Sequence, residues 1–289
     1  MMKYPALFKI ADNASNNSQR RFLRLIRFEY LLLLVASILS LGLLETRWYY
    51  VAYAVVFGAS MSVMSFRSMK KPEKTWYQAR ALAESVKTLT WRFAMRAEPF
   101  DDDRGVDARR DFRNLLNEVL KSNEVLSEAF SDEDPADEQL PGEVQTIREF
   151  SLDQRRDYYL KNRIADQRAW YVLKAKANKR SASIWFWISF AAYAAGFAFI
   201  VTRIVDPVAV GWPTEPLIVF ASAVIGWTQI KKFNELAAAY SLTAQEIGLT
   251  EILITDAKTN KSFSSAVNEA ELAFSREHTQ WAARQHQGG

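Results

Sequence analysis

Residues Ser181 to Thr202 read SASIWFWISFAAYAAGFAFIVT, a run of 22 residues without a charged side chain. Such a run is long enough to cross the ~30 Å hydrocarbon core of a bilayer as a helix. A segment in lipid has to satisfy its backbone hydrogen bonds internally, so runs of this kind decide the class of the protein. The sequence therefore predicts a membrane-spanning helix here.

Three further apolar runs accompany it. Tyr30–Leu44 is free of charge but only 15 residues long, and Trp48–Phe66 follows after three residues. Pro216–Ile230 follows the first-quoted run after a turn-rich connector that contains Asp206 and Pro207. The four runs predict two transmembrane hairpins, at about 28–66 and 181–230, with interfacial aromatic residues at the first turn. A large soluble helical bundle is the alternative.

Basic residues flank the four runs on one side. By the positive-inside rule these flanks, and with them both termini, are predicted to face the cytoplasm. Every basic cluster lies beside a predicted span, so the charges indicate a membrane surface and not nucleic acid as the partner. The flanking residues are Arg20, Arg21, Arg24, Arg27, Arg67, Lys70, Lys71, Lys74, Lys174, Lys176, Lys179, Arg180, Lys231 and Lys232.

Composition gives little indication of an enzyme. The chain of 289 residues has no cysteine and two histidines, so disulfides, thiolate sites and zinc sites are not expected. Neither a phosphate-binding glycine loop nor a strand-glycine-helix unit is present in the sequence. We therefore expect no catalytic residue, no metal site and no cofactor.

The chain divides into two similar halves. An acidic, proline-containing linker at 131–143 separates a first module, 1–130, from a second, 144–289. Each module runs from a basic helix through a hairpin to a Lys-Lys pair and a long charged helix, which suggests a duplication. Asp153–Ala182 lacks Gly and Pro and predicts one helix leading into the third span. The predicted fold class is all-α, a polytopic membrane protein with four transmembrane helices and long cytoplasmic helical extensions.

The predicted spans contain hydroxyls but no Asp, Glu, Lys, Arg or His. This disfavours a proton- or ion-coupled transporter, and it is compatible with a pore made by several subunits. Small residues recur every four positions and allow close helix approach, either inside one four-helix unit or between subunits and around a pore. These residues are Ala54, Gly58, Ser62, Ala192, Gly196, Ser222 and Gly226.

The charged helices carry a second set of candidates. Arg80, Glu84 and Lys87 have the spacing of an exposed or inter-helix ion network. Trp76 and Trp91 are expected to pack against neighbouring helices. Arg92 and Arg96 could hold a nucleotide phosphate or form structural ion pairs.

The last helix places several apolar residues on one face. His278 on that face is interpreted as a packed residue, with ligand contact or pH sensing as the alternative. The face consists of Phe263, Val267, Ala270, Phe274, His278 and Trp281.

Two stretches resemble a known family. They are TWYQARALAESVK from Thr75 to Lys87, continuing through Trp91-Arg92 to Pro99-Phe100, and AYSLTAQE from Ala239 to Glu246. The second is followed by NEAE from Asn268 to Glu271 and by SREHTQW from Ser275 to Trp281, the most specific of these motifs. Both stretches resemble SLATT domains (SMODS- and SLOG-associating two-transmembrane effector domains), here as a fused pair.

The resemblance implies a bacterial inner-membrane effector of a nucleotide-signal-linked antiphage system. Such a protein would form a homo-oligomeric pore or channel, gated by its cytoplasmic helices. A non-conducting membrane scaffold that docks a cytoplasmic partner is the alternative. These 289 residues show no resemblance to a nucleotidyltransferase or sensor domain, so we expect the chain to act alone or with a separately encoded synthase or sensor. Candidate gating or ligand contacts are Arg80, Glu84, Lys87, Trp91, Arg92, Arg276, Glu277, His278 and Trp281.

Overall fold

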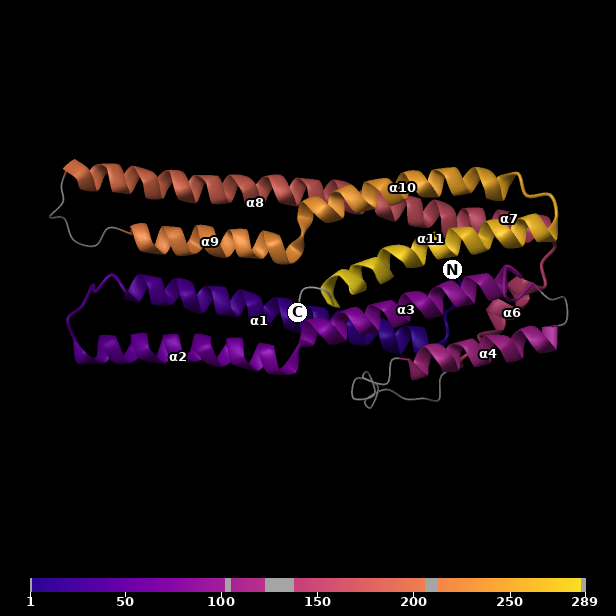
Figure 1. Cartoon of the computed structure of the whole chain (residues 1–289), viewed down its shortest axis with the longest axis horizontal. Helices are drawn as coiled ribbons and strands as arrows, with labels where there is room; N and C mark the ends of the chain where they lie inside the picture. The colour runs from indigo at the N-terminus through magenta and orange to yellow at the C-terminus, as the bar shows by residue number, and fades with distance from the viewer. Residues whose placement is uncertain (1, 102–104, 123–137, 206–212, 287–289) are drawn as a thin grey trace. The chain divides into compact units, whose positions relative to one another are not determined.

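The computed structural model describes residues 2–101, 105–122, 138–205 and 213–286, with only the backbone of residues 105–106 and 275–286. All elements within these ranges are helices, as predicted (Figure 1). They are α1 (Ala6–Leu39), α2 (Arg47–Lys70), α3 (Pro72–Ala94), α4 (Gly105–Lys121), α6 (Gly142–Arg148), α7 (Leu152–Tyr159), the π-helical turn η2 (Leu160–Ile164), α8 (Ala165–Val205), α9 (Thr214–Lys231), α10 (Phe233–Thr255) and α11 (Asn260–His286). Most of the predicted acidic linker, 131–137, lies outside the described residues.

The predicted helix leading into the third span is confirmed. Residues Leu152 to Val205 form one helical run, begun by a capping box in which Ser151 and Gln154 bind each other's backbone N–H groups. The five-residue π-helical turn inside this run was not anticipated. One extra residue in such a turn changes which side chains face the neighbouring helix, and here it brings Arg163 and Ile164 into the interior.

Both helical hairpins end at a lysine with left-handed backbone. Lys71 has φ 41° and Lys232 has φ 49°, and each backbone N–H donates to a carbonyl four residues earlier. Directly after each lysine a 23-residue helix begins, α3 in the first half and α10 in the second. The Lys-Lys pairs that suggested a duplication thus mark the same structural feature twice.

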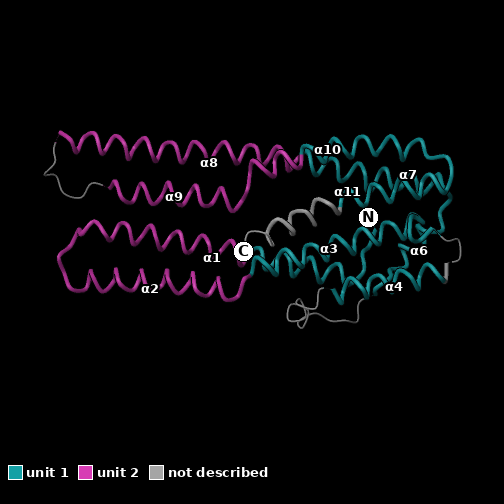
Figure 2. Tube along the Cα trace, in the orientation of Figure 1, with its two compact units in different colours: residues 1–20, 72–172, 241–289 teal, residues 21–71, 173–240 magenta. Residues whose placement is uncertain are grey.

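The Cα trace divides into two compact units, coloured separately in Figure 2. Unit 1 comprises residues 1–20, 72–172 and 241–289, and unit 2 comprises residues 21–71 and 173–240. Unit 2 holds the apolar parts of both hairpins. Unit 1 holds most of the charged helices.

The helices of unit 2 contact one another in series. In the first hairpin Arg67 of α2 pairs with Glu29 of α1 at 3.1 Å. In the second, Leu217 of α9 lies against Gly196 of α8. Tyr30 of α1 lies against Gly226 of α9, so the order of neighbours is α8, α9, α1 and α2 (Figure 1).

Two helical runs are long and apolar enough to cross a membrane, one within Arg47–Ala94 and one within Leu152–Val205. The most apolar 18 residues of these runs have mean hydropathies of 1.4 and 1.9, and only 11% of those residues are buried. The core helix of a soluble protein would be mostly buried, so these segments differ from such a helix. The apolar parts of α1 and α9 are shorter, and the four-span topology stays a prediction.

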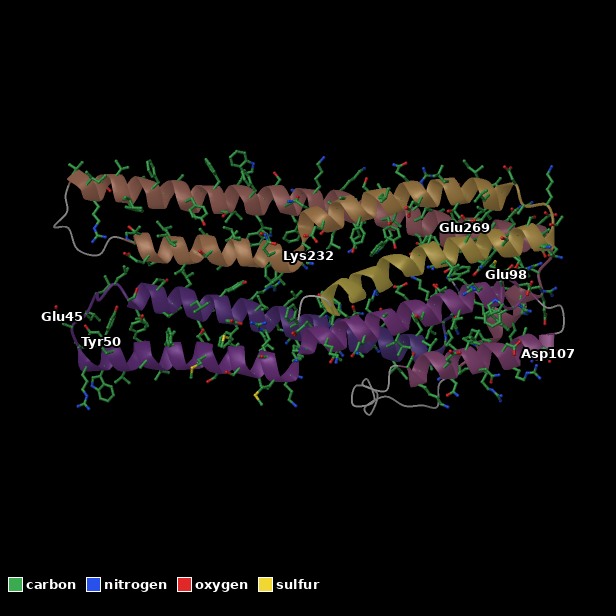
Figure 3. All side chains as sticks on the ribbon, in the orientation of Figure 1. Glu45, Tyr50, Glu98, Asp107, Lys232 and Glu269 are labelled. Atoms are coloured by element: carbon green, nitrogen blue, oxygen red, sulfur yellow. The ribbon has the colours of Figure 1, made fainter. Side chains whose placement is uncertain are left out.

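Hydroxyl groups on these hairpins bond within their own helices. Ser62 donates to the Gly58 carbonyl at 2.8 Å, and Thr202 donates to the Phe199 carbonyl at 2.9 Å. A hydroxyl satisfied in this way can face lipid without an unpaired donor. Polar side chains gather at the hairpin ends, where Figure 3 places Glu45 and Tyr50 at the α1–α2 turn and Lys232 at the end of α9.

Candidate functional site

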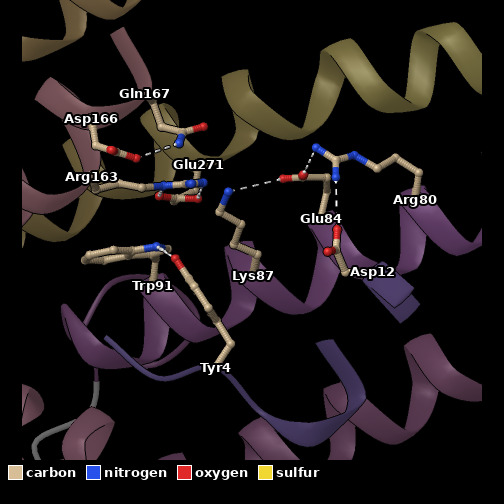
Figure 4. Close-up of polar contacts among 10 residues, drawn as sticks. All are labelled: Tyr4, Asp12, Arg80, Glu84, Lys87, Trp91, Arg163, Asp166, Gln167 and Glu271. Atoms are coloured by element: carbon tan, nitrogen blue, oxygen red, sulfur yellow. Dashed lines mark hydrogen bonds and ion pairs between the residues drawn. The ribbon is translucent and has the colours of Figure 1, made fainter. Parts of the chain in front are cut away.

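An ion network along α3 is the first part of the candidate site, which lies in unit 1 (Figure 4). Arg80 bonds the Glu84 carboxylate at 2.7 Å and the Asp12 carboxylate of α1 at 3.2 Å. Lys87 approaches the other Glu84 oxygen at 4.0 Å. The predicted Arg80–Glu84–Lys87 network is therefore present, and Asp12 extends it to a second helix.

A buried ion pair is the second part. The Arg163 guanidinium of η2 donates twice to the Glu271 carboxylate of α11, at 2.8 and 2.7 Å, with both side chains almost fully buried. Tyr159 donates a third hydrogen bond to Glu271 at 2.8 Å. A bidentate contact of this kind matches the planar fork of Arg and fixes the orientation of both groups.

Electrostatics keep these groups in defined protonation states. Burial by itself would lower the pKa of Arg163, but the Glu271 charge and hydrogen bonds outweigh it, so that pKa is raised. Burial, reinforced by Glu271, raises the pKa of Tyr159 well above its ordinary value. Arg163 therefore stays charged, and Tyr159 stays a hydrogen-bond donor.

Trp91 connects the buried pair to the N-terminal segment. Its indole N–H donates to the Tyr4 hydroxyl at 2.9 Å, while its ring centroid lies 5.6 Å from that of Tyr159 and 5.8 Å from the Arg163 guanidinium. Burial raises the pKa of Tyr4 to about 12, so the hydroxyl remains neutral at physiological pH. The prediction that Trp91 packs against neighbouring helices is confirmed.

Lys87 lies between the two charge clusters. Burial lowers its pKa, and the nearby Arg163 charge lowers it further. The Glu84 and Glu271 charges act in the opposite direction, so charged groups of α3, η2 and α11 all affect the pKa of Lys87.

Arginines surround the C-terminal end of α3. Arg148 donates to the carbonyls of Phe93 and Phe100 at 2.6 and 2.9 Å, and Arg155 donates to the Met95 carbonyl at 2.6 Å. The last carbonyls of a helix lack partners within it and attract cations. Arg148 and Arg155 are buried, and they donate to the Phe93 carbonyl in the last turn of α3 and to two carbonyls of the segment that follows it.

The other two arginines of this helix end were predicted to hold phosphate or to form ion pairs. Arg92 donates to the Glu98 carbonyl at 2.6 Å, and Arg96 donates to the Arg148 carbonyl at 2.9 Å. These contacts go to backbone oxygens and have a structural purpose. Ion pairs and a phosphate site at Arg92 and Arg96 both stay predictions.

Two matches to one family cover nearly the whole chain. Residues 5–156 match SMODS and SLOG-associating 2TM effector domain 3, and residues 159–281 match SMODS and SLOG-associating 2TM effector domain 1. The chain belongs to the SLATT family. It is a tandem of two SLATT domains, as the resemblance predicted. No curated protein and no solved structure matches the chain.

SLATT domains are two-transmembrane effector domains associated with conflict and defence systems, and they are not a known enzyme family. Each match contains one hairpin: α1–α2 in the first and α8–α9 in the second. The first helices of the two SLATT domains are thus α1 and α8, and the second helices are α2 and α9.

The C-terminal motif of this SLATT protein is only partly described. Arg276, Glu277, His278 and Trp281 belong to α11, but their side chains lie outside the described residues. Earlier on the same helix, the predicted apolar face is confirmed. Its buried members are Phe263, Val267, Ala270 and Phe274.

The small residues of the spans fall into two groups. Ala192 and Gly196 are buried against the neighbouring helix, and Gly226 lies against Tyr30. Ala54, Ser62 and Ser222 are exposed, and no described atom lies within 4 Å of where a Cβ on Gly58 would be. The first group packs inside unit 2, whereas Ala54, Gly58 and Ser62 of the second group lie on an open side of α2.

Sequence reasoning missed Asp12, Tyr159, Arg163 and Glu271. Asp12 lies in a mostly uncharged polar segment and Arg163 in a charged one, and neither segment by itself reveals its long-range partner. Glu271 could have been found, because it is the last residue of the NEAE motif on which the SLATT resemblance partly rests. Its burial depends on α11 packing along α3, which spacing within one helix does not reveal.

Proposed function

We propose that this tandem SLATT protein crosses the bacterial inner membrane four times, with both termini cytoplasmic, and assembles into a homo-oligomeric pore. The pore acts without catalysis, and its opening stops growth of an infected cell. The observation that carries the proposal is the exposed apolar surface of two hairpins without an ionisable residue inside their predicted spans. The basic flanks support the orientation.

Gating through unit 1 is part of the proposal. The helical run from Leu152 to Val205 carries Arg163 in unit 1 and continues into the hairpin of unit 2. A change at the Arg163–Glu271 pair therefore acts on the same continuous helix that enters the membrane. A separately encoded protein that makes or senses a nucleotide signal would supply the trigger, in keeping with the association of SLATT domains with SMODS and SLOG.

The test is expression of the full chain in bacteria that carry a potential-sensitive dye, together with ion flux into liposomes containing the purified protein. Loss of membrane potential and flux from the liposomes are expected when the trigger is present. Normal potential and growth under triggering, with a soluble partner captured on the cytoplasmic helices, would favour a non-conducting scaffold instead.

Two exchanges compare the buried pair with a surface pair. Arg163→Met removes the buried pair and is expected to change the threshold of potential loss. Arg168→Met is the matched control, because Arg168 is five residues away, forms a pair with Glu251 at 3.1 Å, and is about half exposed. Equal behaviour of both variants and the unaltered chain would show that the buried pair does not gate.

A further inference from the structure

The contact between the two hairpins of unit 2 has a defined composition. It joins α1, the first helix of the first SLATT domain, to α9, the second helix of the second domain. Tyr30 lies against Gly226, and the Arg27 guanidinium lies 4.9 Å from the centre of the Trp227 ring. The two helices, α1 and α9, are antiparallel (Figure 1).

This contact leaves one first helix and one second helix at the ends of the series, α8 and α2. On α2, Ser60 is buried while Gly58 and Ser62, two residues to either side, face outward. On α8, Gly196 is buried while Ala194 and Ala198 are exposed in the same way. Two residues turn about 200° around a helix, so each outer edge lies opposite the edge that packs inside unit 2.

We propose that a second copy of this chain covers these edges, with α2 of one copy packed against α8 of the next. The pairing joins a first SLATT helix to a second one in antiparallel direction, and so continues the pattern of the α1–α9 contact within the chain. Such a head-to-tail contact uses two different surfaces, and repeating it by rotation about one axis along the membrane normal gives a closed ring. This inference rests on the proposed function, because it requires an oligomer in the membrane.

The repeat also gives the register of the proposed interface. Gly58 lies 13 residues before Lys71, as Val219 lies 13 residues before Lys232. Since Leu217 lies beside Gly196, Val219 is level with Ala194 on the antiparallel α8. Gly58 is therefore level with Ala194. One helical turn away, four residues earlier on α2 and four residues later on α8, Ala54 is level with Ala198. Small residues face small residues, which permits close helix approach.

Paired cysteines test the interface without background, because the chain has no cysteine. Ala54→Cys and Ala198→Cys are made in two differently tagged chains, which are co-expressed and oxidised in the membrane. A mixed disulfide dimer is expected from the pair and none from either variant alone. The double variant Ala54→Cys/Ala198→Cys is expected to give a ladder that ends at the subunit number of the ring.

Phe197→Cys is the matched control for the α8 cysteine. Phe197 is also exposed and adjoins Ala198, but it lies about 100° around the helix from Ala198, so it should cross-link with Ala54→Cys several-fold less. Disulfides from Ala54→Cys alone would indicate a symmetric α2–α2 contact and overturn the inference. Absence of any mixed disulfide would indicate lipid on these edges and overturn it as well.

Gly58→Leu gives an independent readout. The described structure has open space at Gly58, so the monomer should keep its helix content while the ladder is lost. Ion flux is recorded on the same membranes to separate the two hypotheses. A ladder without flux would contradict the pore and leave the interface intact, whereas flux without a ladder would contradict the interface alone.

Discussion

Arg163 is 1% exposed and Glu271 is fully buried. For single residues, burial decides how much the loss of an ion-pair partner lowers the stability of the fold. Removing a guanidinium from water costs several kcal/mol, which a bidentate carboxylate can offset. Losing one partner leaves the other charge buried and unpaired. Arg168 and Glu251 form a pair of similar length near the surface, where water screens both charges.

We predict that Glu271→Gln destabilises unit 1 by about 3–5 kcal/mol, because it leaves the Arg163 charge without its counter-ion. Glu251→Gln should cost less than about 1 kcal/mol. Denaturant unfolding of the purified chain, followed by near-ultraviolet circular dichroism of the tryptophans, measures both. Similar losses for the two variants would show that burial of the Arg163–Glu271 pair does not matter.

Tyr4 and Trp91 give a prediction on pH. The pKa of Tyr4 is raised from 10.0 to about 12 in the folded chain, so the folded state keeps a proton that the unfolded state loses. The associated stability is complete below pH 10 and declines as the pH rises toward 12, by about 3 kcal/mol at most. Tyr4→Phe should remove this decline.

The same exchange leaves the indole N–H of Trp91 without its acceptor, which should lower stability at pH 8 by about 1–3 kcal/mol. Thermal unfolding at pH 8, 10 and 11 separates the two effects, with Tyr50→Phe at an exposed position as the control. An unchanged alkaline slope in Tyr4→Phe would contradict the assignment to Tyr4.

At the scale of elements, helices and their apolar faces were predictable because they depend on spacing along one segment. The hairpins, the α11 face and the helix into the third span all follow from periodicity and charge. The π-helical turn was not predictable, since the residues of Leu160–Ile164 also occur in ordinary α-helices. The turn contains Arg163, whose buried partner Glu271 is far away in the sequence, so the residues of the turn alone do not reveal the contact.

The helix junctions at Lys71 and Lys232 yield a prediction of opposite signs for neighbouring lysines. A left-handed residue other than Gly costs about 1–2 kcal/mol, so Lys232→Gly should be neutral or stabilise the chain by up to about 1 kcal/mol. Lys231→Gly, one residue earlier inside α9, should destabilise it by about 0.5–1 kcal/mol.

Lys232→Pro should be severely destabilising, because proline requires a negative φ and cannot donate to the Thr228 carbonyl. Thermal unfolding in one detergent compares the three variants. A loss of stability in Lys232→Gly as large as that in Lys231→Gly would mean that the left-handed turn is absent in solution.

For the whole molecule, the two compact units draw on different sources of stability. Unit 1 depends on a packed aromatic and ionic core, with the rings of Phe93, Phe100 and Phe112 within 5.8 Å of one another and Arg148 over Phe93. The hairpins of unit 2 expose large apolar side chains and rely on lipid and on hydrogen bonds within each helix. A single unfolding transition is therefore not expected.

Hydrogen exchange on the full chain in lipid nanodiscs tests this division. Glu271→Gln is expected to speed exchange in α3, α4 and α11, whose packing depends on the core of unit 1, by tenfold or more. Exchange in α9 and in residues 173–205 of α8 should stay unchanged, because those amides are protected within single helices in lipid. Equal acceleration throughout the chain would show instead that the membrane hairpins and the charged helices unfold as one cooperative body.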